Sequence, residues 1–208
     1  MRKNFKSSKE DGKVMSYLKL SEFEKIGEKL EYYSILEFTK KDLKKINFDC
    51  GIEEYNNFLL NDAIDLDKKH ISKTFIVLTR KEKIVIGYYT LATDNLKLTP
   101  DEKMDTDLDK VSFRSFPAMK LGKLAVNKNI PDEFKMKGYG SFILDLIDSY
   151  VWNILKLGVG CRFITVDADI EYRKDTYKFY EKNGFRKNEV FKNSNSLTIS
   201  MRRDIFHE

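Results

Sequence analysis

The segment KMKGYGSFILDLIDSYV, residues 135–151, constrains the fold of this chain more than any other. It places Gly138 and Gly140 at the start of an apolar helical repeat, where glycine costs about 1 kcal/mol relative to alanine. A strand-like pattern over residues 116–126 precedes the glycines, and helical spacing of apolar side chains follows over residues 139–157. The pattern therefore predicts a strand, a polar turn with glycines and a helix in direct succession.

The two glycines have two interpretations, and the residues alone leave both open. A helix N-terminus exposes unpaired N–H groups and attracts phosphate, and Lys135 and Lys137 add charge to the same turn. Glycine equally permits a tight turn and close packing of a helix on a sheet. The dinucleotide fingerprint is incomplete because position 143 is Ile143, and no Gly-Lys-Ser/Thr triplet is present. A phosphate ligand of another kind is the functional interpretation.

The patterns on either side of this unit predict a mixed α/β sheet. Strands are predicted at 33–38, 73–80, 84–93, 161–169, 185–191 and 196–205, and helices at 51–70 and 171–184, the second ending at Gly184. The short KEK segment between residues 73–80 and 84–93 indicates a hairpin. Residues 97–115 contain Pro100 and little periodicity, so a loop or insertion is expected there.

The N-terminal segment differs in composition from the rest of the chain. Residues 1–13 are mostly polar and predict a basic tail. Phe23, Ile26 and Leu30 then recur at helical spacing, which indicates a short amphipathic helix. We therefore expect residues 1–30 to form an appendage, a basic tail with a short helix, and residues 31–208 a single domain.

Charge and cysteine content limit the functional classes. The 38 Lys and Arg against 33 Asp and Glu give a net charge of +5, which tolerates a polyanionic partner without requiring one. Cys50 and Cys161 form no C-x-x-C pair, and His70 and His207 are the other candidate ligands, so no metal site is predicted. No apolar run approaches the ~20 residues of a membrane span, and no signal-peptide core is present. We expect a cytoplasmic protein with reduced cysteines that does not act in a membrane.

Two segments together carry a resemblance to a known family. LGKLAVNKNIPDEFKMKGYGSFILDLI, followed by VDADIEYRKDTYKFYEKNGF, is similar to the central signature of the GNAT N-acetyltransferase superfamily. The resemblance implies a mostly antiparallel central sheet with helices on both faces, and acetyl-CoA as the cosubstrate without a metal. It implies that Leu124, Ala125 and Val126 lie along the pantetheine arm. It also implies that the pyrophosphate is wrapped by Lys135, Lys137, Gly138, Tyr139, Gly140 and Ser141.

The same resemblance implies the chemistry of the site. The helix that ends in FYEKNGF would place Tyr180 near the thioester sulfur, where a phenol with a pKa of about 10 suits a thiol leaving group. Simple packing between helix and sheet is the other interpretation of this tyrosine. A backbone N–H within 124–126 would hold the oxyanion. The proton of the amine is expected to pass to water or to a carboxylate, and neither Asp167 nor Asp169 is distinguished as the base.

The acceptor is the least determined part of the prediction. FDCGIEEYNNFL, IGYYTLAT, LGKLAV, VDA and FYEKNGF, in that order, are similar to the branch with toxins of toxin–antitoxin pairs, which acetylate the amino group of aminoacyl-tRNA. A protein or small-molecule amine is the alternative acceptor. A non-catalytic acyl-CoA-binding or nucleic-acid-binding module is the alternative of another class, and the presence of Tyr180 favours the enzyme. An antitoxin is an implied partner, and a homodimer is left open.

Overall fold

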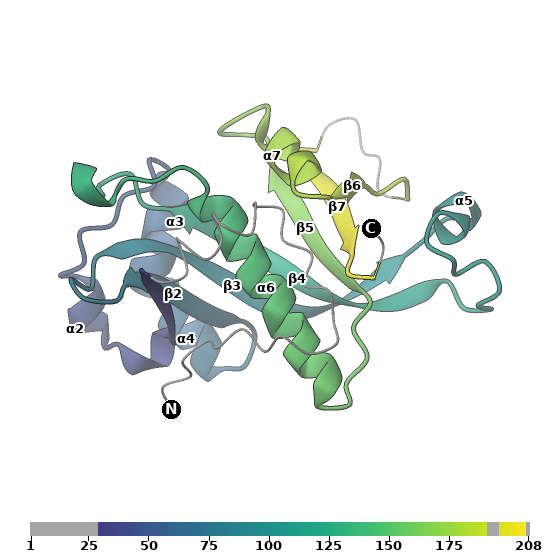
Figure 1. Cartoon of the computed structure of the whole chain (residues 1–208), viewed down its shortest axis with the longest axis horizontal. Coiled ribbons are helices and arrows are strands. Elements are labelled where there is room, and N and C mark those ends of the chain that lie inside the picture. The colour runs from purple at the N-terminus through teal and green to yellow at the C-terminus, as the bar shows by residue number, and fades with distance from the viewer. Residues whose placement is uncertain (1–28, 191–195, 207–208) are drawn as a thin grey trace.

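The computed structural model describes residues 29–190 and 196–206, and the chain is drawn in Figure 1. In this part of the chain one sheet is formed in the order β1-β2-β3-β4-β5-β7-β6. The strands are β1 (Leu30–Ser34), β2 (Lys73–Thr79), β3 (Val85–Lys97), β4 (Ser115–Val126), β5 (Phe163–Asp169), β6 (Arg186–Lys187) and β7 (Thr198–Asp204). Neighbouring strands run antiparallel except β4 and β5, which confirms the predicted mixed, mostly antiparallel sheet.

Helices cover both faces of the sheet, as predicted (Figure 1). The α-helices are α2 (Lys40–Leu43), α3 (Glu53–Asn57), α4 (Ala63–Lys68), α5 (Pro100–Met104), α6 (Tyr139–Lys156) and α7 (Thr176–Lys182). Short 3-10 turns are η1 (Ile35–Glu37) and η3 (Asp132–Phe134), and η2 (Phe58–Asp62) is a π-helical segment that joins α3 to α4. The predicted helix at 51–70 is therefore present with one wider turn inside it.

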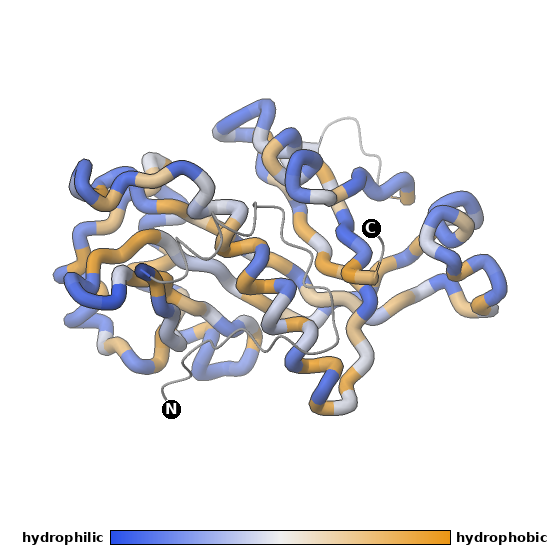
Figure 2. The backbone as a smooth tube through the Cα atoms, in the orientation of Figure 1, coloured by the Kyte–Doolittle hydropathy of each residue, from blue (hydrophilic) through white to orange (hydrophobic). Residues whose placement is uncertain are grey.

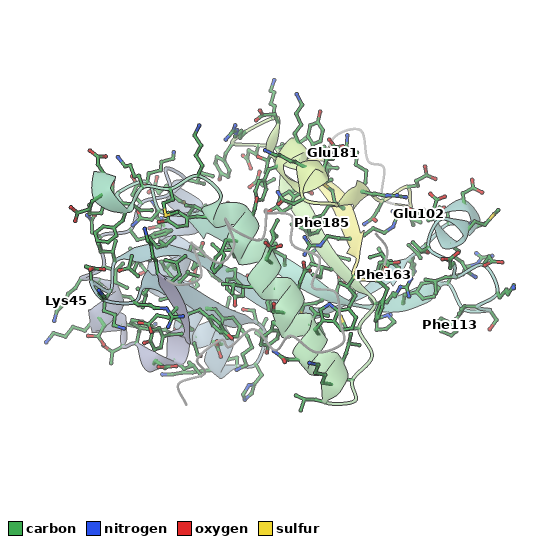
Figure 3. All side chains as sticks on the ribbon, viewed as in Figure 1. Lys45, Glu102, Phe113, Phe163, Glu181 and Phe185 are labelled. Atoms are coloured by element: carbon green, nitrogen blue, oxygen red, sulfur yellow. The ribbon has the colours of Figure 1, made fainter. Side chains whose placement is uncertain are left out.

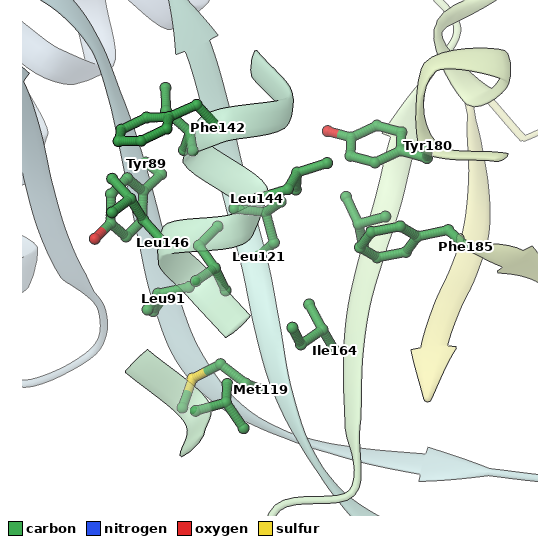
Figure 4. Packing of buried hydrophobic residues seen from close by; sticks show 14 of the residues in the cluster. Tyr89, Leu91, Met119, Leu121, Phe142, Leu144, Leu146, Ile164, Tyr180 and Phe185 are labelled. Atoms are coloured by element: carbon green, nitrogen blue, oxygen red, sulfur yellow. The ribbon is translucent and has the colours of Figure 1, made fainter. Parts of the chain in front are cut away.

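Alternating side chains of the central strands divide between two cores. Val77, Ile86 and Tyr89 pack with α6 and α7 on one face, whereas Ile76 and Tyr88 pack with α3 and α4 on the other. Figure 4 shows the first of these clusters, and Figure 2 shows that the hydrophobic stretches follow the strands and α6. Burial of both faces fixes the register of the sheet and thus the place of the strand ends.

The parallel pair β4 and β5 determines where a ligand can enter. Their pairing runs from Ala118 opposite Phe163 to Leu121 opposite Val166, although both strands continue beyond these residues. The two strands part beyond this point, as Figure 1 shows. Their separation leaves an opening in the sheet, and backbone groups of β4 and β5 along this opening do not pair with each other.

The predicted loop at 97–115 is an arm that extends β3 and β4 beyond the sheet (Figure 1). It carries α5, whose first turn has a capping box between Thr99 and Glu102 and begins with Pro100. Glu102 is buried, and its Oε1 lies 2.5 Å from Nη1 of Arg202 on β7. Figure 3 labels Glu102 on the arm together with Phe113, which is exposed. The arm is therefore fastened to the C-terminal strands.

Four predicted boundaries were wrong, and one of them is the strand predicted at 185–191, in which, among the described residues, only β6 (Arg186–Lys187) is a strand. The strand at 33–38 is replaced by β1 and η1, because the Ser34 side chain accepts a hydrogen bond from the N–H of Leu36 and starts the 3-10 turn. Leu30, predicted to lie in a helix, begins β1, while the tail and the rest of that helix lie outside the described residues. The helix predicted from residue 171 begins only at Thr176.

Candidate active site

A cavity of about 160 Å³ lies where β4 and β5 part. Residues from four elements line it, namely Tyr55 of α3, Leu124, Ala125 and Val126 of β4, Asp169 of β5, and Thr176 and Tyr180 of α7. The predicted pantetheine strand and the predicted catalytic tyrosine are thus brought to the same cavity, although their roles stay predictions. Arg173 also lines it, from the loop before α7.

The end of β4 presents backbone donors to this opening. The N–H of Asn127 donates to the carbonyl of Ile86 at 2.8 Å, and Ala125 stands opposite Tyr88 in the same register. Because antiparallel pairs alternate between bonded and non-bonded residues, Ala125 belongs to a bonded pair. The N–H groups of Leu124 and Val126 therefore point away from β3 and into the gap left by β5.

The first turn of α6 explains both glycines in structural terms. Gly138 precedes the helix with a φ of 100°, a left-handed conformation that favours glycine. A Cβ on Gly140 would lie 3.1 Å from Cζ of Phe179 on α7, so even an alanine there would require the Phe179 ring to shift by a few tenths of an ångström. Close packing is thus established for Gly140, and the phosphate interpretation stays a prediction.

The same turn leaves donors without acceptors. The N–H of Phe142 donates to the carbonyl of Gly138 at 2.8 Å, which is the first bond of the helix. Within residues 29–190 and 196–206, the N–H groups of Tyr139, Gly140 and Ser141 have no acceptor. With the positive end of an 18-residue helix behind them, these groups suit an anionic ligand.

The two lysines of the turn differ in their contacts. Lys135 is exposed, and its Nζ lies 2.6 Å from Asp132 in the preceding turn. Lys137 is also exposed. Neither lysine is buried against the cavity, so any contact with a ligand would be made at the surface.

Tyr180 satisfies both interpretations of the sequence. Its ring packs edge-on against Phe179 and Phe185, and it is 7% exposed. Its hydroxyl has no hydrogen-bond partner among the described residues, and Figure 4 shows it pointing away from Phe185 and toward α6. Burial raises the pKa of Tyr180, and the charges of Tyr55 and Asp169 raise it further. The phenol therefore keeps its proton at neutral pH and can donate it.

Several residues at the cavity were not predicted to be in the site, among them Tyr172 in the loop before α7. Tyr55 comes from α3, where its apolar spacing indicated only a core position, and Ile52 precedes the same helix. The Oη of Tyr55 lies 3.5 Å from Oδ2 of Asp169. No local signal links residues 114 positions apart in the chain, so the sequence could not predict this pair.

The two carboxylates left open by the sequence are now distinguished. Asp169 lines the cavity, whereas Asp167 lies 2.6 Å from Nζ of Lys120 and lines a separate, polar cavity of about 270 Å³. Thr165 lies in that second cavity as well, since alternate residues of β5 share one face. Asp169 differs from Thr165 and Asp167 because it is the last residue of β5, beyond the part of the strand that pairs with β4.

Two groups considered from the sequence have structural roles. Cys50 is buried, its Sγ lies 3.2 Å from Oδ1 of Asn56, and burial raises the pKa of its thiol, so it is not a thiolate nucleophile at neutral pH. Tyr88 and Tyr89 are buried, and the hydroxyl of Tyr88 donates to the carbonyl of Tyr55 at 2.8 Å. Both tyrosines therefore pack within the sheet, and Tyr88 also holds α3 against it.

Known proteins were compared with the chain by sequence and by structure. No family model and no curated protein matches the chain, whereas many solved structures do. AtaT complexed with acetyl-methionyl-tRNAfMet is 24% identical with a TM-score of 0.63, covering 82% of this chain and 93% of that chain. A mutant of KacT is 23% identical with a TM-score of 0.63, covering 83% and 94%. The chain has the GNAT fold of these toxins.

The shared GNAT fold confirms the resemblance found in the sequence. The structure of AtaTR bound with AcCoA is 23% identical to the chain with a TM-score of 0.60 and covers 83% of this chain and 93% of that chain. Among the described residues no helix is long and apolar enough to cross a membrane. The same residues contain no group of three His, Cys, Asp or Glu side chains that could hold a metal ion.

Proposed function

We propose that the chain is an N-acetyltransferase that transfers the acetyl group of acetyl-CoA directly to a primary amine. The observation that carries the proposal is the cavity at the parted strands, which is flanked by the N–H groups of Leu124 and Val126 and by the neutral hydroxyl of Tyr180. A thioester needs these two devices, because its oxygen gains negative charge and its sulfur leaves as a thiolate.

The surrounding residues fit acetyl-CoA as the donor. The three N–H groups at the start of α6 would donate hydrogen bonds to the pyrophosphate oxygens, and the pantetheine arm would lie along residues 124–126. A neighbour of the same fold, AtaTR, was solved with AcCoA bound. These points support the assignment of Lys137, Gly138 and the residues that follow them to the coenzyme site.

For the acceptor we propose the α-amino group of an aminoacyl-tRNA. Support comes from AtaT, whose structure contains acetyl-methionyl-tRNAfMet, and from the net charge of +5 of this chain. AtaT is also known in complex with the antitoxin AtaR, and an antitoxin partner is proposed here on the same grounds. A homodimer and a cytoplasmic location remain predictions from the sequence.

Acetyl-CoA is expected to stabilise the fold. At a hundredfold excess over Kd, binding to the folded state alone contributes about 2.7 kcal/mol, equivalent to a melting shift on the order of 5–10 °C. Thermal denaturation with and without millimolar acetyl-CoA measures this shift. If the melting temperature does not move, the coenzyme assignment is wrong.

Gly138→Val is expected to abolish that shift without unfolding the protein, because a branched side chain is strained at a φ of 100° and would obstruct the first turn of α6. Gly158→Val is the matched control, since Gly158 has a φ of 86° at the opposite end of α6 with nothing within 4 Å of a Cβ. The control should carry similar strain and still show the acetyl-CoA shift. If acetyl-CoA raises the melting temperature of both variants equally, the turn at Gly138 does not bind the pyrophosphate.

Binding of tRNA is expected to weaken steeply as salt rises, because basic side chains that contact phosphates release condensed counterions. With about four such contacts, affinity should fall by roughly 10²-fold between 50 and 200 mM salt. Filter binding of aminoacylated tRNA at several salt concentrations gives the slope. A flat salt dependence would exclude the nucleic acid as the acceptor.

A further inference from the structure

Asp169 stands at the open end of β5, where the strand no longer pairs with β4. Among the described residues that line the active-site cavity it is the one carboxylate. Its Oδ1 accepts the N–H of Glu171 at 2.9 Å, which holds the side chain in place. Its Oδ2 faces the hydroxyl of Tyr55 at 3.5 Å, longer than the 2.5–3.0 Å typical of an O–H···O bond. That oxygen therefore keeps the capacity to accept a stronger donor.

No cation of the described chain neutralises Asp169. Arg173, which also lines the cavity, lies 2.7 Å from Asp175, and Lys123 lies 2.7 Å from Glu54. Lys120 of β4 is paired with Asp167. A carboxylate without a cationic partner among the described residues, beside an apolar strand end, is complementary to a ligand that brings its own positive charge.

Asp169 is also close to the reacting atoms expected for acetyl transfer. Its charge and that of Tyr55 contribute to the raised pKa of Tyr180, after the larger effect of burial. Tyr180 is the group that would face the thioester sulfur, so the amine must arrive at the carbonyl carbon on the other side of the same small cavity. Asp169 and Tyr55 line this cavity together with Tyr180, from the end of β5 and from α3.

We propose that Asp169 binds the acceptor as an ammonium ion and takes the first of the two protons that its nitrogen must lose. This inference rests on the proposed function and adds to it the residue that activates the amine. The ordinary ammonium pKa near 7.7–8 means that most α-amino groups are protonated at neutral pH and cannot attack. A carboxylate in contact with the ammonium both binds the acceptor and removes the proton that prevents the nitrogen from attacking.

The proton balance then closes. The ammonium gives one proton to Asp169, and the free electron pair on nitrogen forms the C–N bond as the carbonyl electrons move to oxygen. When the C–S bond breaks, the thiolate takes the proton of Tyr180, and the second proton of the nitrogen restores the Tyr180 phenol. Asp169 releases its proton to water, so the products are the amide, coenzyme A thiol and one proton.

Tyr55 is assigned as a positioning residue in this arrangement. Its ring has Nζ of Lys123 at 4.2 Å from its centroid, and its backbone carbonyl accepts the hydroxyl of Tyr88. Burial raises the pKa of Tyr55, so its hydroxyl stays a donor toward Asp169 at neutral pH. The remaining titratable groups near Asp169 are Cys50 and Glu54 toward α3, Glu171, Tyr172 and Arg173 in the following loop, and Tyr180 on α7.

Asp169→Asn tests the inference, with Asp167→Asn as the matched control. Both variants remove one negative charge from the same strand, but Asp167 faces Lys120 and the other cavity. The assay follows transfer of radiolabelled acetyl from acetyl-CoA to a pool of aminoacylated tRNA between about pH 6 and pH 8.5. We expect kcat/KM of Asp169→Asn to fall about 10²-fold at pH 6.5, with Asp167→Asn close to wild type.

The pH dependence separates proton transfer from a structural effect. Without the carboxylate only free amine reacts, so the activity of Asp169→Asn should rise with pH and approach that of wild type as the amine deprotonates in solution. Asp169→Glu should restore part of the activity and the wild-type pH profile. The acetyl-CoA melting shift should be the same in all three variants, since the pyrophosphate turn is untouched.

Each outcome decides between the inference and the proposed function. If Asp169→Asn matches Asp167→Asn, or loses the same factor at every pH, the inference is wrong while the proposed function stands. If wild type binds acetyl-CoA but acetylates no amine offered, the proposed function fails and the inference falls with it. A loss confined to low pH, with rescue by glutamate, supports both.

Discussion

Tyr180→Phe is expected to slow acetyl transfer by about 10²–10⁴-fold, because it removes the proton that the leaving thiolate needs. That factor corresponds to roughly 3–5 kcal/mol of activation free energy. The variant keeps the ring that packs against Phe179 and Phe185, so the free energy of unfolding should change little. Affinity for acetyl-CoA should also persist, since the N–H groups at the start of α6 are unaltered.

Tyr177→Phe is the matched control for this experiment. Tyr177 lies on the same helix, and Nζ of Lys187 stands 4.0 Å from its ring centroid, away from the cavity-lining residues. It should transfer acetyl groups normally. Near-normal turnover of Tyr180→Phe, under conditions where chemistry limits the rate, would refute the general-acid role. Because burial raises the pKa of Tyr180, its proton should cause no decline of wild-type activity up to about pH 9.

Arg203→Met is expected to destabilise the protein by about 3–5 kcal/mol, equivalent to roughly 10 °C in melting temperature. Arg203 is 2% exposed, contacts Asp148 of α6, and donates to the carbonyl of Asn183 after α7 at 3.1 Å. Its guanidinium also stacks over the ring of Phe185 at 4.8 Å. One side chain of β7 thus holds both helices that flank the cavity, and its loss leaves Asp148 buried without its cation.

The double variant Arg203→Met with Asp148→Leu provides the control. Replacing both partners by apolar groups removes the uncompensated charge, so it should recover most of the lost stability. A double variant less stable than Arg203→Met would contradict the role of the ion pair.

The same pair gives a pH dependence with a definite sign. Burial raises the pKa of Asp148 from 3.8 to about 7, although Arg203 opposes the shift. Because the folded-state pKa lies above the unfolded value, the contribution of the protonated Asp148 carboxyl to stability is complete below about pH 4 and is lost as the pH rises through about 7, where Asp148 ionises and pairs with Arg203. In Arg203→Met the opposing cation is absent, so chemical denaturation should show a larger deficit against wild type at about pH 8 than at about pH 5.

Short-range sequence patterns predicted those helices, strands and turns that depend only on residues close together in the chain. Residues 116–157 were predicted closely, because the alternation of β4, the left-handed Gly138 and the apolar stripe of α6 are all short-range features. Gly184 was likewise predicted from its position after α7, and its φ of 80° agrees. The capping box of Thr99 and Glu102 was present in the sequence as a helix signal within the predicted loop.

Contacts between distant segments could not be predicted in the same way. The pairing of Glu102 with Arg202 and the approach of Tyr55 to Asp169 join residues 100 and 114 positions apart. Neither pair follows from periodicity, because both depend on how the sheet brings its edges and helices together. The choice between Asp167 and Asp169 depended on the parting of β4 and β5, which is a tertiary property.

We propose that this chain moves an acetyl group from acetyl-CoA to the amino group of an aminoacyl-tRNA. Mass spectrometry of aminoacyl-tRNA incubated with isotopically labelled acetyl-CoA and the protein tests it most directly, with Tyr180→Phe as the inactive reference. The account predicts a labelled acetyl group on the α-nitrogen of the esterified amino acid with wild type, and far less with the variant. Label on free amino acids, polyamines or protein lysines, with none on aminoacyl-tRNA, would contradict it.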